Sequence, residues 1–291
     1  MPFEHLGDRV IIRHPKGASA DILLFGATVI SWKSGSSRNP SPKERLFVSS
    51  KAKLDGSKPV RGGIPVVFPC FGAPVHQEHL QLSQHGFARN QTWEWCGIVT
   101  DNEAEVSAKF SLDSAAVQSI YKHSFHLDYV VTLAEHQITT GLYVANTSAD
   151  AMEFQALFHN YIRAPSDEVD VTPLQHLLYL DKTDILADGQ PKQKLETRSV
   201  VDVKRETDSV YENAPQDYEI KWGNGGVRIR SLNLNDVVIW NPGEEGRKMS
   251  DMEEGGWKSY ICVEPGFVRG FVELKSGERW IGQQSLSVTE G

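Results

Sequence analysis

The sequence predicts an all-β protein, built as an antiparallel sandwich or barrel. Apolar and polar residues alternate with a period of two over several segments, which is typical of strands with one buried face. Turn sequences such as Asp188-Gly189 and Ser276-Gly277 separate many of these segments. No strand–helix–strand rhythm is visible, so the doubly wound folds that bind nucleotides are not expected.

Eight segments carry the strand pattern. It is clearest in 125–133, where every second residue from Phe125 to Leu133 is apolar, so that one face of the strand can enter a core. In chain order the predicted strands are 22–32, 106–112, 125–133, 139–144, 227–232, 237–240, 260–263 and 280–288.

Helical pattern is scarce, and short helices are predicted only near 114–121 and 216–221. The stretch 34–45 contains Gly35, Pro40 and Pro42 and has strand-like sequence on both sides. We therefore expect a surface loop there and not a linker between domains. An all-β chain of 291 residues without an internal repeat is expected to form a single domain over 1–291.

Charge and cysteine content exclude several kinds of partner. The net charge is −8 and no run of Lys and Arg occurs, so no nucleic-acid binding is expected. The N-terminus lacks a signal-peptide pattern and no window approaches about twenty apolar residues, which predicts a cytoplasmic protein without membrane contact. Cys70, Cys96 and Cys262 are far apart, so neither a disulfide framework nor a thiolate metal site is expected.

Two arginines lie in turn-rich segments beside apolar strand sequence. Arg61 precedes Gly62-Gly63, and Arg89 follows Gly86. Missing side chains let a ligand approach the backbone, and a planar guanidinium group can donate two hydrogen bonds to a phosphate. Together they indicate a site for an anionic, hydroxyl-rich ligand, although either arginine alone could be an ordinary surface charge.

One imidazole and one carboxylate are candidate acid and base. His159 falls on the polar face of the strand-like segment 152–163, where the alternative is a surface histidine. Glu264 precedes Pro265-Gly266, which we expect to stop a strand and leave the carboxylate at a rim. The alternative for Glu264 is a solvated glutamate at a turn.

Standard catalytic strings are absent: no phosphate-binding GxxxxGK[ST], GxGxxG, HExxH or GxSxG sequence occurs. His76, His79 and His85 are close enough in sequence to suggest zinc. No clear further ligand motif follows them, so no metal is expected.

Seven strings, taken in order, carry a resemblance to a known family. From about Phe25 to near the C-terminus the chain resembles the glucose-6-phosphate 1-epimerases, or hexose-6-phosphate mutarotases, of the galactose mutarotase-like superfamily. The strings are Lys53-Leu54-Asp55-Gly56, Arg61-Gly62-Gly63-Ile64-Pro65, Gln84-His85-Gly86-Phe87-Ala88-Arg89, Leu157-Phe158-His159-Asn160-Tyr161, Glu206-Thr207-Asp208-Ser209-Val210-Tyr211, Val238-Ile239-Trp240-Asn241-Pro242 and Cys262-Val263-Glu264-Pro265-Gly266.

The resemblance implies a large β-sandwich of the galactose mutarotase type and cofactor-free interconversion of the α and β anomers of hexose 6-phosphates. By motif position His159 resembles the general acid and Glu264 the general base. The substrate-binding residues implied in the same way are Arg61, Gln84, Arg89 and Asp208, with His85 as a further pocket residue. The only partner expected is the small-molecule substrate, bound by a monomer.

One departure from the family pattern concerns Phe267, because relatives often carry histidine at this position. Any supporting role that this histidine has behind the reacting groups of the relatives is therefore absent from this chain. Its hexose preference or pH response can differ from theirs.

Anomer exchange needs a base and an acid of the kinds that Glu264 and His159 provide. Opening a pyranose ring requires a base that takes the proton of the anomeric hydroxyl and an acid that protonates the ring oxygen. Two alternatives stay open: a neutral aldose 1-epimerase in which the arginines are structural, and a non-catalytic sandwich that binds sugar phosphates. A glycosidase would need two carboxylates flanking the bond, and only Glu264 is marked out.

Overall fold

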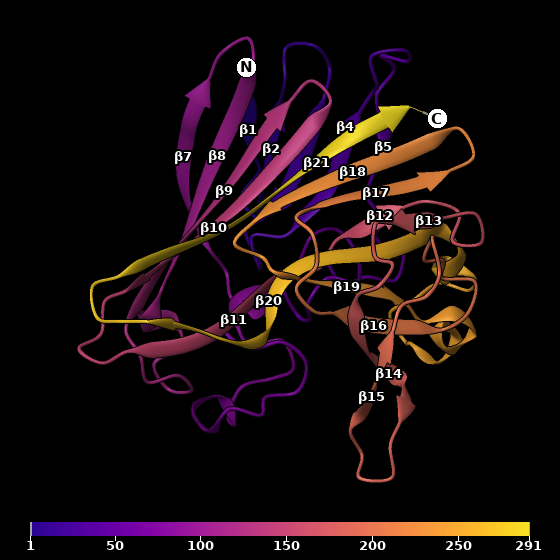
Figure 1. Ribbon diagram of the computed structural model, residues 1–291. Coiled ribbons are helices and arrows are strands. Elements are labelled where there is room, and N and C mark those ends of the chain that lie inside the picture. The colour runs from indigo at the N-terminus through magenta and orange to yellow at the C-terminus, as the bar shows by residue number, and fades with distance from the viewer. Residues whose placement is uncertain (1, 291) are drawn as a thin grey trace.

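The computed structural model describes residues 2–290, whose regular secondary structure is mostly antiparallel strand (Figure 1). In this range the strands build two eight-stranded sheets and one five-stranded sheet, and the helices are short 3-10 turns. The prediction of an all-β fold is confirmed. No helix within 2–290 has the length and apolar character needed to cross a membrane.

The N-terminal strands form the five-stranded sheet in simple sequence order. Its members are β1 (Phe3–His5), β2 (Arg9–Arg13), β3 (Ser19–Leu23), β4 (Val29–Ser34) and β5 (Lys43–Glu44).

The second sheet has the order β13-β17-β18-β21-β10-β9-β8-β7. Its members are β7 (Glu94–Asp101), β8 (Glu105–Asp113), β9 (Phe125–Ala134), β10 (Gln137–Asn146), β13 (Asp170–Thr172), β17 (Asp217–Trp222), β18 (Gly225–Leu232) and β21 (Arg279–Glu290).

The third sheet follows the order β15-β14-β16-β19-β20-β11-β6, and β12 also pairs with β20. Its members are β6 (Val66–Val67), β11 (Met152–Phe158), β12 (Tyr161–Arg163), β14 (Leu178–Ile185), β15 (Pro191–Leu195), β16 (Thr207–Tyr211), β19 (Asp236–Asn241) and β20 (Tyr260–Leu274). Figure 1 shows β14 and β15 extending as a hairpin beyond the other strands.

One large apolar cluster draws on all three sheets, from Val10 to Leu286. Strand β9 shows why: its residues alternate between buried and half-buried along their whole length, as the period of two predicts. Burial of a single leucine such as Leu127 stabilises the fold by about 1.5 to 3 kcal/mol. The cluster therefore fixes the strands on which the functional side chains are mounted.

Three local predictions are wrong. The predicted strand 22–32 is a hairpin of β3 and β4, because the chain turns through Gly26 and Ala27 with positive φ. The predicted helix 216–221 is the strand β17, whose alternating Tyr218 and Ile220 are buried. The helix predicted near 114–121 is reduced to a 3-10 turn over Ser114–Ala116.

The expected end of a strand at Pro265-Gly266 is also wrong. Strand β20 continues through both residues and pairs with β19 on one side. On its other side β12 pairs with residues 260–262, whereas β11 pairs from Gly266 onward. Pro265 falls in the interval between these two partners, where a strand tolerates a residue without an N–H group.

A buried pair of amides joins the second and third sheets. Asn160 donates hydrogen bonds to the carbonyl of Val263, at 2.9 Å, and to Oε1 of Gln284, at 2.7 Å. Gln284 returns a bond of 2.7 Å to Oδ1 of Asn160 and donates one of 3.2 Å to Thr140 on β10. Asn160 follows His159 and Val263 precedes Glu264, so this network holds the backbone beside both candidate catalytic residues.

We predict that Gln284→Leu lowers the free energy of unfolding by about 1 to 3 kcal/mol, because it leaves the buried Oδ1 of Asn160 without a hydrogen-bond donor. Urea unfolding followed by far-ultraviolet circular dichroism measures the change. Gln283→Leu, one position along on the half-buried face of β21, is the matched control. Equal stability of the two variants would contradict a structural role of the amide pair.

Candidate active site

All seven residues proposed from the sequence line one cavity of about 280 Å³. They are Arg61, Gln84, His85, Arg89, His159, Asp208 and Glu264. Phe71, Lys182, Val238, Trp240 and Met249 complete its wall. The residues come from separate loops and strands, and the third sheet brings them together.

Glycines let the turn segments pass close to the sheets. At Gly63 φ is +71°, and a Cβ atom would lie 2.2 Å from the carbonyl oxygen of Val29. At Gly86 φ is +72°, and a Cβ atom would lie 2.2 Å from the carbonyl oxygen of Phe68. A side chain at either position would clash, so the glycines noted in the sequence are required for packing.

His159 and Glu264 face each other at the buried end of the cavity. Nδ1 of His159 lies 3.3 Å from Oε1 of Glu264, and the two residues are 7% and 1% exposed. His159 directly follows β11, and Glu264 lies within β20. The alternatives of a surface histidine and a solvated glutamate are therefore excluded.

Burial sets the ionisation of this pair. Burial lowers the pKa of His159 well below its usual value, and the charges of His85, Arg89 and Arg61 add to the effect. Burial also raises the pKa of Glu264 well above its usual value, reinforced by Asp208 and opposed by Lys182 and Arg89. Burial therefore favours the neutral form of each group, the unprotonated imidazole and the protonated carboxyl group.

The two arginines differ in how they are held. Nε of Arg61 lies 3.2 Å from Oδ1 of Asp251, and its guanidinium group also donates a bond of 3.1 Å to the hydroxyl of Tyr161. Burial lowers the pKa of Arg61, but Tyr161 and Asp251 more than offset this, and the net shift is upward. Arg89 donates to the carbonyl of Gln84 at 2.9 Å, while its buried Nε has no hydrogen-bond partner.

His85 stands beside His159 with its ring edge-on, at a centroid distance of 5.9 Å. Burial lowers the pKa of His85 to about 3, and Arg89, Lys182 and Arg61 contribute in the same direction. A neutral imidazole at this position can donate or accept a hydrogen bond without adding charge to the cavity.

Lys182 is a pocket residue that the sequence analysis missed. Its Nζ lies 3.0 Å from Oδ2 of Asp208 and 5.3 Å from the centre of the Phe71 ring. The pairing of β14 with β15 shifts register between Asp181 and Ile185, and such bulges re-aim side chains near active sites. No residue pattern along β14 marks this irregularity, so the sequence offered no signal for Lys182.

Aromatic rings fix the orientation of the imidazole of His159. The ring of Tyr161 stacks on it at 4.8 Å and 8°, and the ring of Trp240 meets it nearly at right angles, at 5.8 Å. Trp240 also lines the cavity, where its face is available to pack against a sugar.

The family departure at Phe267 does not touch this site. Phe267 lines a separate cavity with Asp236 and Arg269. Phe267 is therefore not among the residues that line the cavity around His159 and Glu264.

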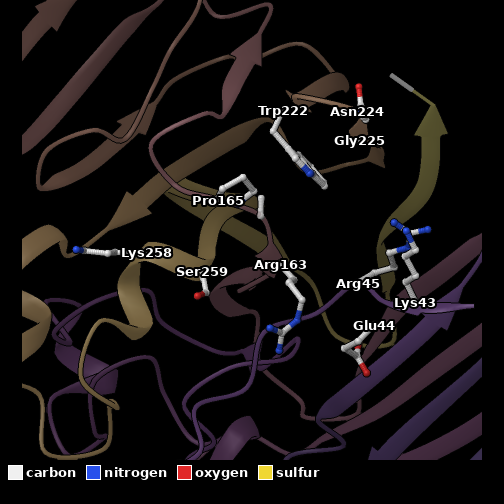
Figure 2. Close-up of a pocket in the computed structure, with 11 residues that line it drawn as sticks. Lys43, Glu44, Arg45, Arg163, Pro165, Trp222, Asn224, Gly225, Lys258 and Ser259 are labelled. Atoms are coloured by element: carbon white, nitrogen blue, oxygen red, sulfur yellow. The ribbon is translucent and has the colours of Figure 1, made fainter.

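A second cavity is larger, at about 520 Å³, but it shares no lining residue with the first. Figure 2 shows its wall, which includes Arg45, Arg163, Lys258 and Trp222. It contains cations and one carboxylate, Glu44, whose oxygens already accept hydrogen bonds from Ser31 and from backbone amides. Without a paired acid and base it is not the candidate active site.

The sequence pattern of the aldose 1-epimerase family matches residues 8–287, so this chain belongs to that family. A protein of Cenchrus ciliaris, provisionally named glucose-6-phosphate 1-epimerase, is 31% identical over 96% of this chain and 84% of its own length. A protein of Escherichia coli strain K12 with the same provisional name is 29% identical over 89% of this chain and 83% of its own length. The resemblance seen in the motif strings is confirmed.

Solved structures show the same fold. A Salmonella typhimurium crystal structure, provisionally described as a mutarotase, has a TM-score of 0.84 at 24% identity, covering 99% of this chain and 93% of that one. The galactose 1-epimerase of Lactobacillus acidophilus NCFM has a TM-score of 0.75 at 13% identity, covering 100% and 98%. The sandwich is therefore of the galactose mutarotase type, as expected.

We predict that His159 in the free protein takes up its proton at a lower pH than an ordinary histidine, because burial disfavours the charged imidazolium and lowers its pKa. Long-range ¹H–¹⁵N correlation spectra of the imidazole rings report the charge directly. The partly exposed His126 is the control, because its contacts with Asp113 and Asp128 outweigh partial burial and raise its pKa. Titration of His159 at an ordinary pKa would show that the pair is less desolvated than its burial implies.

Proposed function

We propose that this enzyme interconverts the α and β anomers of hexose 6-phosphates, with glucose 6-phosphate as the first substrate to test. One observation carries the proposal: a buried acid–base pair, His159 and Glu264, shares a cavity with two guanidinium groups. The provisional names of the relatives agree with this substrate. The chemistry needs only proton transfers, which these side chains can supply without a cofactor.

In the proposed reaction Glu264 removes the proton of the anomeric hydroxyl while His159 protonates the ring oxygen. The ring opens to the aldehyde, and rotation about the C1–C2 bond presents the other face of the carbonyl. Ring closure runs the same transfers backwards and restores both residues. General acid–base groups of this kind each contribute roughly 10²- to 10⁴-fold in rate.

Arg61 and Arg89 are proposed to hold the phosphate, which converts binding energy at C6 into orientation at C1. Gln84 and His85 lie on the same turn segment as Arg89, and Asp208 is placed to accept hydrogen bonds from ring hydroxyls. The acidic net charge of the chain does not oppose this, because the local field in a narrow cavity is set by its own cations.

The phosphate also has a proposed role in ionisation. The charges of Arg89 and Arg61 help to depress the pKa of His159, and a bound dianion would offset them. The proton on Glu264 can then move to His159, giving the imidazolium and carboxylate that ring opening requires. The number of protons bound by the pair does not change. The substrate changes only which of the two side chains carries the proton.

A neutral aldose 1-epimerase is the second candidate function. The observation in its favour is the pairing of Arg61 with Asp251 and Tyr161, which gives this arginine a structural partner. Arg89 has no carboxylate partner within the described part of the chain, and this favours the phosphorylated substrate. The two functions differ in the predicted effect of removing Arg89.

The first test is anomer exchange of glucose 6-phosphate, measured by saturation-transfer NMR. We expect clear acceleration over buffer, and a loss of about 10²- to 10⁴-fold in turnover for Glu264→Gln, because the amide cannot accept the proton. Substrate binding by this variant should persist. Glu273→Gln, at an exposed position of the same strand, is the control and should be unaffected. Absence of exchange in the unmodified enzyme would reject the proposed function.

We further predict that Arg89→Ala weakens binding of the transition state for glucose 6-phosphate by about 2 to 5 kcal/mol, because the buried charge pair between Arg89 and the phosphate is lost. The rate for unphosphorylated glucose should change little. The measurement is kcat/KM for both sugars by exchange NMR. Arg45→Ala, in the wall of the second cavity (Figure 2), serves as the matched control. An equal loss for both sugars would favour the neutral aldose enzyme.

A further inference from the structure

A third side chain of metal-binding type lies beside the proposed acid and base. A ring nitrogen of His159, Sγ of Cys262 and a carboxylate oxygen of Glu264 lie within 4.8 Å of one another, and all three residues are buried. Cys262 and Glu264 are two residues apart on β20 and therefore point to the same face. The sequence showed no thiolate metal spacing, because the cluster arises only when β20 lies beside the end of β11.

Two polar atoms of this cluster have no partner. Nδ1 of His159 and Oε2 of Glu264 are buried without a hydrogen bond. A buried polar atom left unsatisfied lowers the stability of the fold, so a ligand that engages both atoms would remove that cost. By contrast, His76, His79 and His85 do not form such a group within residues 2–290: His76 contacts Glu153 at 3.1 Å, and His85 belongs to the cavity wall.

The spacing suits a zinc ion. A point among three atoms no more than 4.8 Å apart lies within about 2.8 Å of each, and zinc bonds to nitrogen, oxygen and sulfur are about 2.0 to 2.3 Å long. Shifts below about 1 Å would therefore close the site. The mixed nitrogen, sulfur and oxygen donors match zinc, whereas magnesium prefers oxygen ligands alone.

Two of the three cations in the cavity wall are paired with carboxylates. Arg61 lies 3.2 Å from Asp251, and Lys182 lies 3.0 Å from Asp208. Arg89 has no carboxylate partner among residues 2–290, and the negative charge that the ligands gain on binding offsets its repulsion of the ion. On binding, the thiol of Cys262 and the carboxyl group of Glu264 each release a proton to solvent, and the sulfur–zinc and oxygen–zinc bonds form. The thiolate and the carboxylate then supply two negative charges opposite the two positive charges of the ion.

We propose that Cys262, His159 and Glu264 form an inhibitory Zn²⁺ site at the buried end of the active-site cavity, which His159 and Glu264 line and which the buried Cys262 adjoins. Zinc takes the lone pairs that the acid and base need for proton transfer, and it occupies the place of the reacting carbon. It is a competitor of the substrate, and the reaction does not use it. The inhibition rests on the proposed function, whereas the binding of zinc does not.

The test combines direct binding with activity. Metal-free enzyme is titrated with Zn²⁺ by calorimetry, with Mg²⁺ as the negative control, and with Co²⁺ to detect the charge-transfer band of a sulfur–cobalt bond. All proteins carry Cys96→Ser, which removes the exposed thiol. Cys262→Ser is compared with Cys70→Ser, which removes a buried thiol outside the cluster.

We expect one Zn²⁺ per chain and a sulfur–cobalt band, with both unchanged in Cys70→Ser. Cys262→Ser should weaken zinc binding at least about 100-fold, since losing even an outer-shell partner costs 10- to 100-fold. It should also remove zinc inhibition while keeping anomer exchange. If Cys262→Ser does not fold, which thermal melting reports, Cys262→Ala is used for the binding comparison.

Failure of the two proposals can be told apart. The zinc site is overturned if Cys262→Ser binds zinc as tightly as the protein that keeps the Cys262 thiol. It is also overturned if the unmodified cluster binds no zinc. Both conclusions hold whether or not the protein catalyses anomer exchange. Cysteine-dependent binding in a protein without anomer exchange supports the site and rejects the proposed function. Binding that leaves the exchange rate unchanged overturns the inhibitory role.

Discussion

The reciprocal amide pair of Asn160 and Gln284 is the constraint on which the candidate site depends. It ties the turn after β11 to β21 of the facing sheet, and through the carbonyl of Val263 it also holds β20. His159 and Glu264 are the neighbours of Asn160 and Val263 in the chain. Because the amides are fully buried, any displacement of one sheet against the other would break bonds that water cannot replace. The distance between acid and base is therefore set by the join between the sheets.

The same burial that positions the pair also sets its chemistry. A histidine and a glutamate removed from water both prefer their neutral forms, and the arginines deepen this preference for the histidine. A site with fixed positive charges next to a neutral pair is poised to respond to an anionic ligand. The phosphate would then have two effects: it would orient the sugar, and its negative charge would offset the charges of the arginines. His159 and Glu264 together with Cys262 offer nitrogen, oxygen and sulfur ligands, and this mixture suits the proposed Zn²⁺ ion.

Much of the architecture could be predicted from the sequence. The alternation in 125–133 identified β9, because a period of two has no other structural explanation. The hairpin of β3 and β4 was missed because the segment 22–32 is mostly apolar and Gly26 is its only glycine. Strand β17 was mistaken for a helix although Tyr218, Ile220 and Trp222 alternate with charged residues, a period of two that is typical of a strand. The continuation of β20 through Pro265 depends on a change of partner, which is a property of the whole sheet.

For the site, the sequence by itself determined which residue types are present and, through the ordered motif strings, which positions to consider. It also determined where glycine was needed, as at Gly63 and Gly86, since the backbone there permits no side chain. Only the tertiary structure decided that His159 and Glu264 are buried and adjacent, that Lys182 enters the cavity and that Cys262 joins the pair. The physical reason is that burial and proximity arise when strands far apart in the chain pair in one sheet, and no local pattern encodes that pairing.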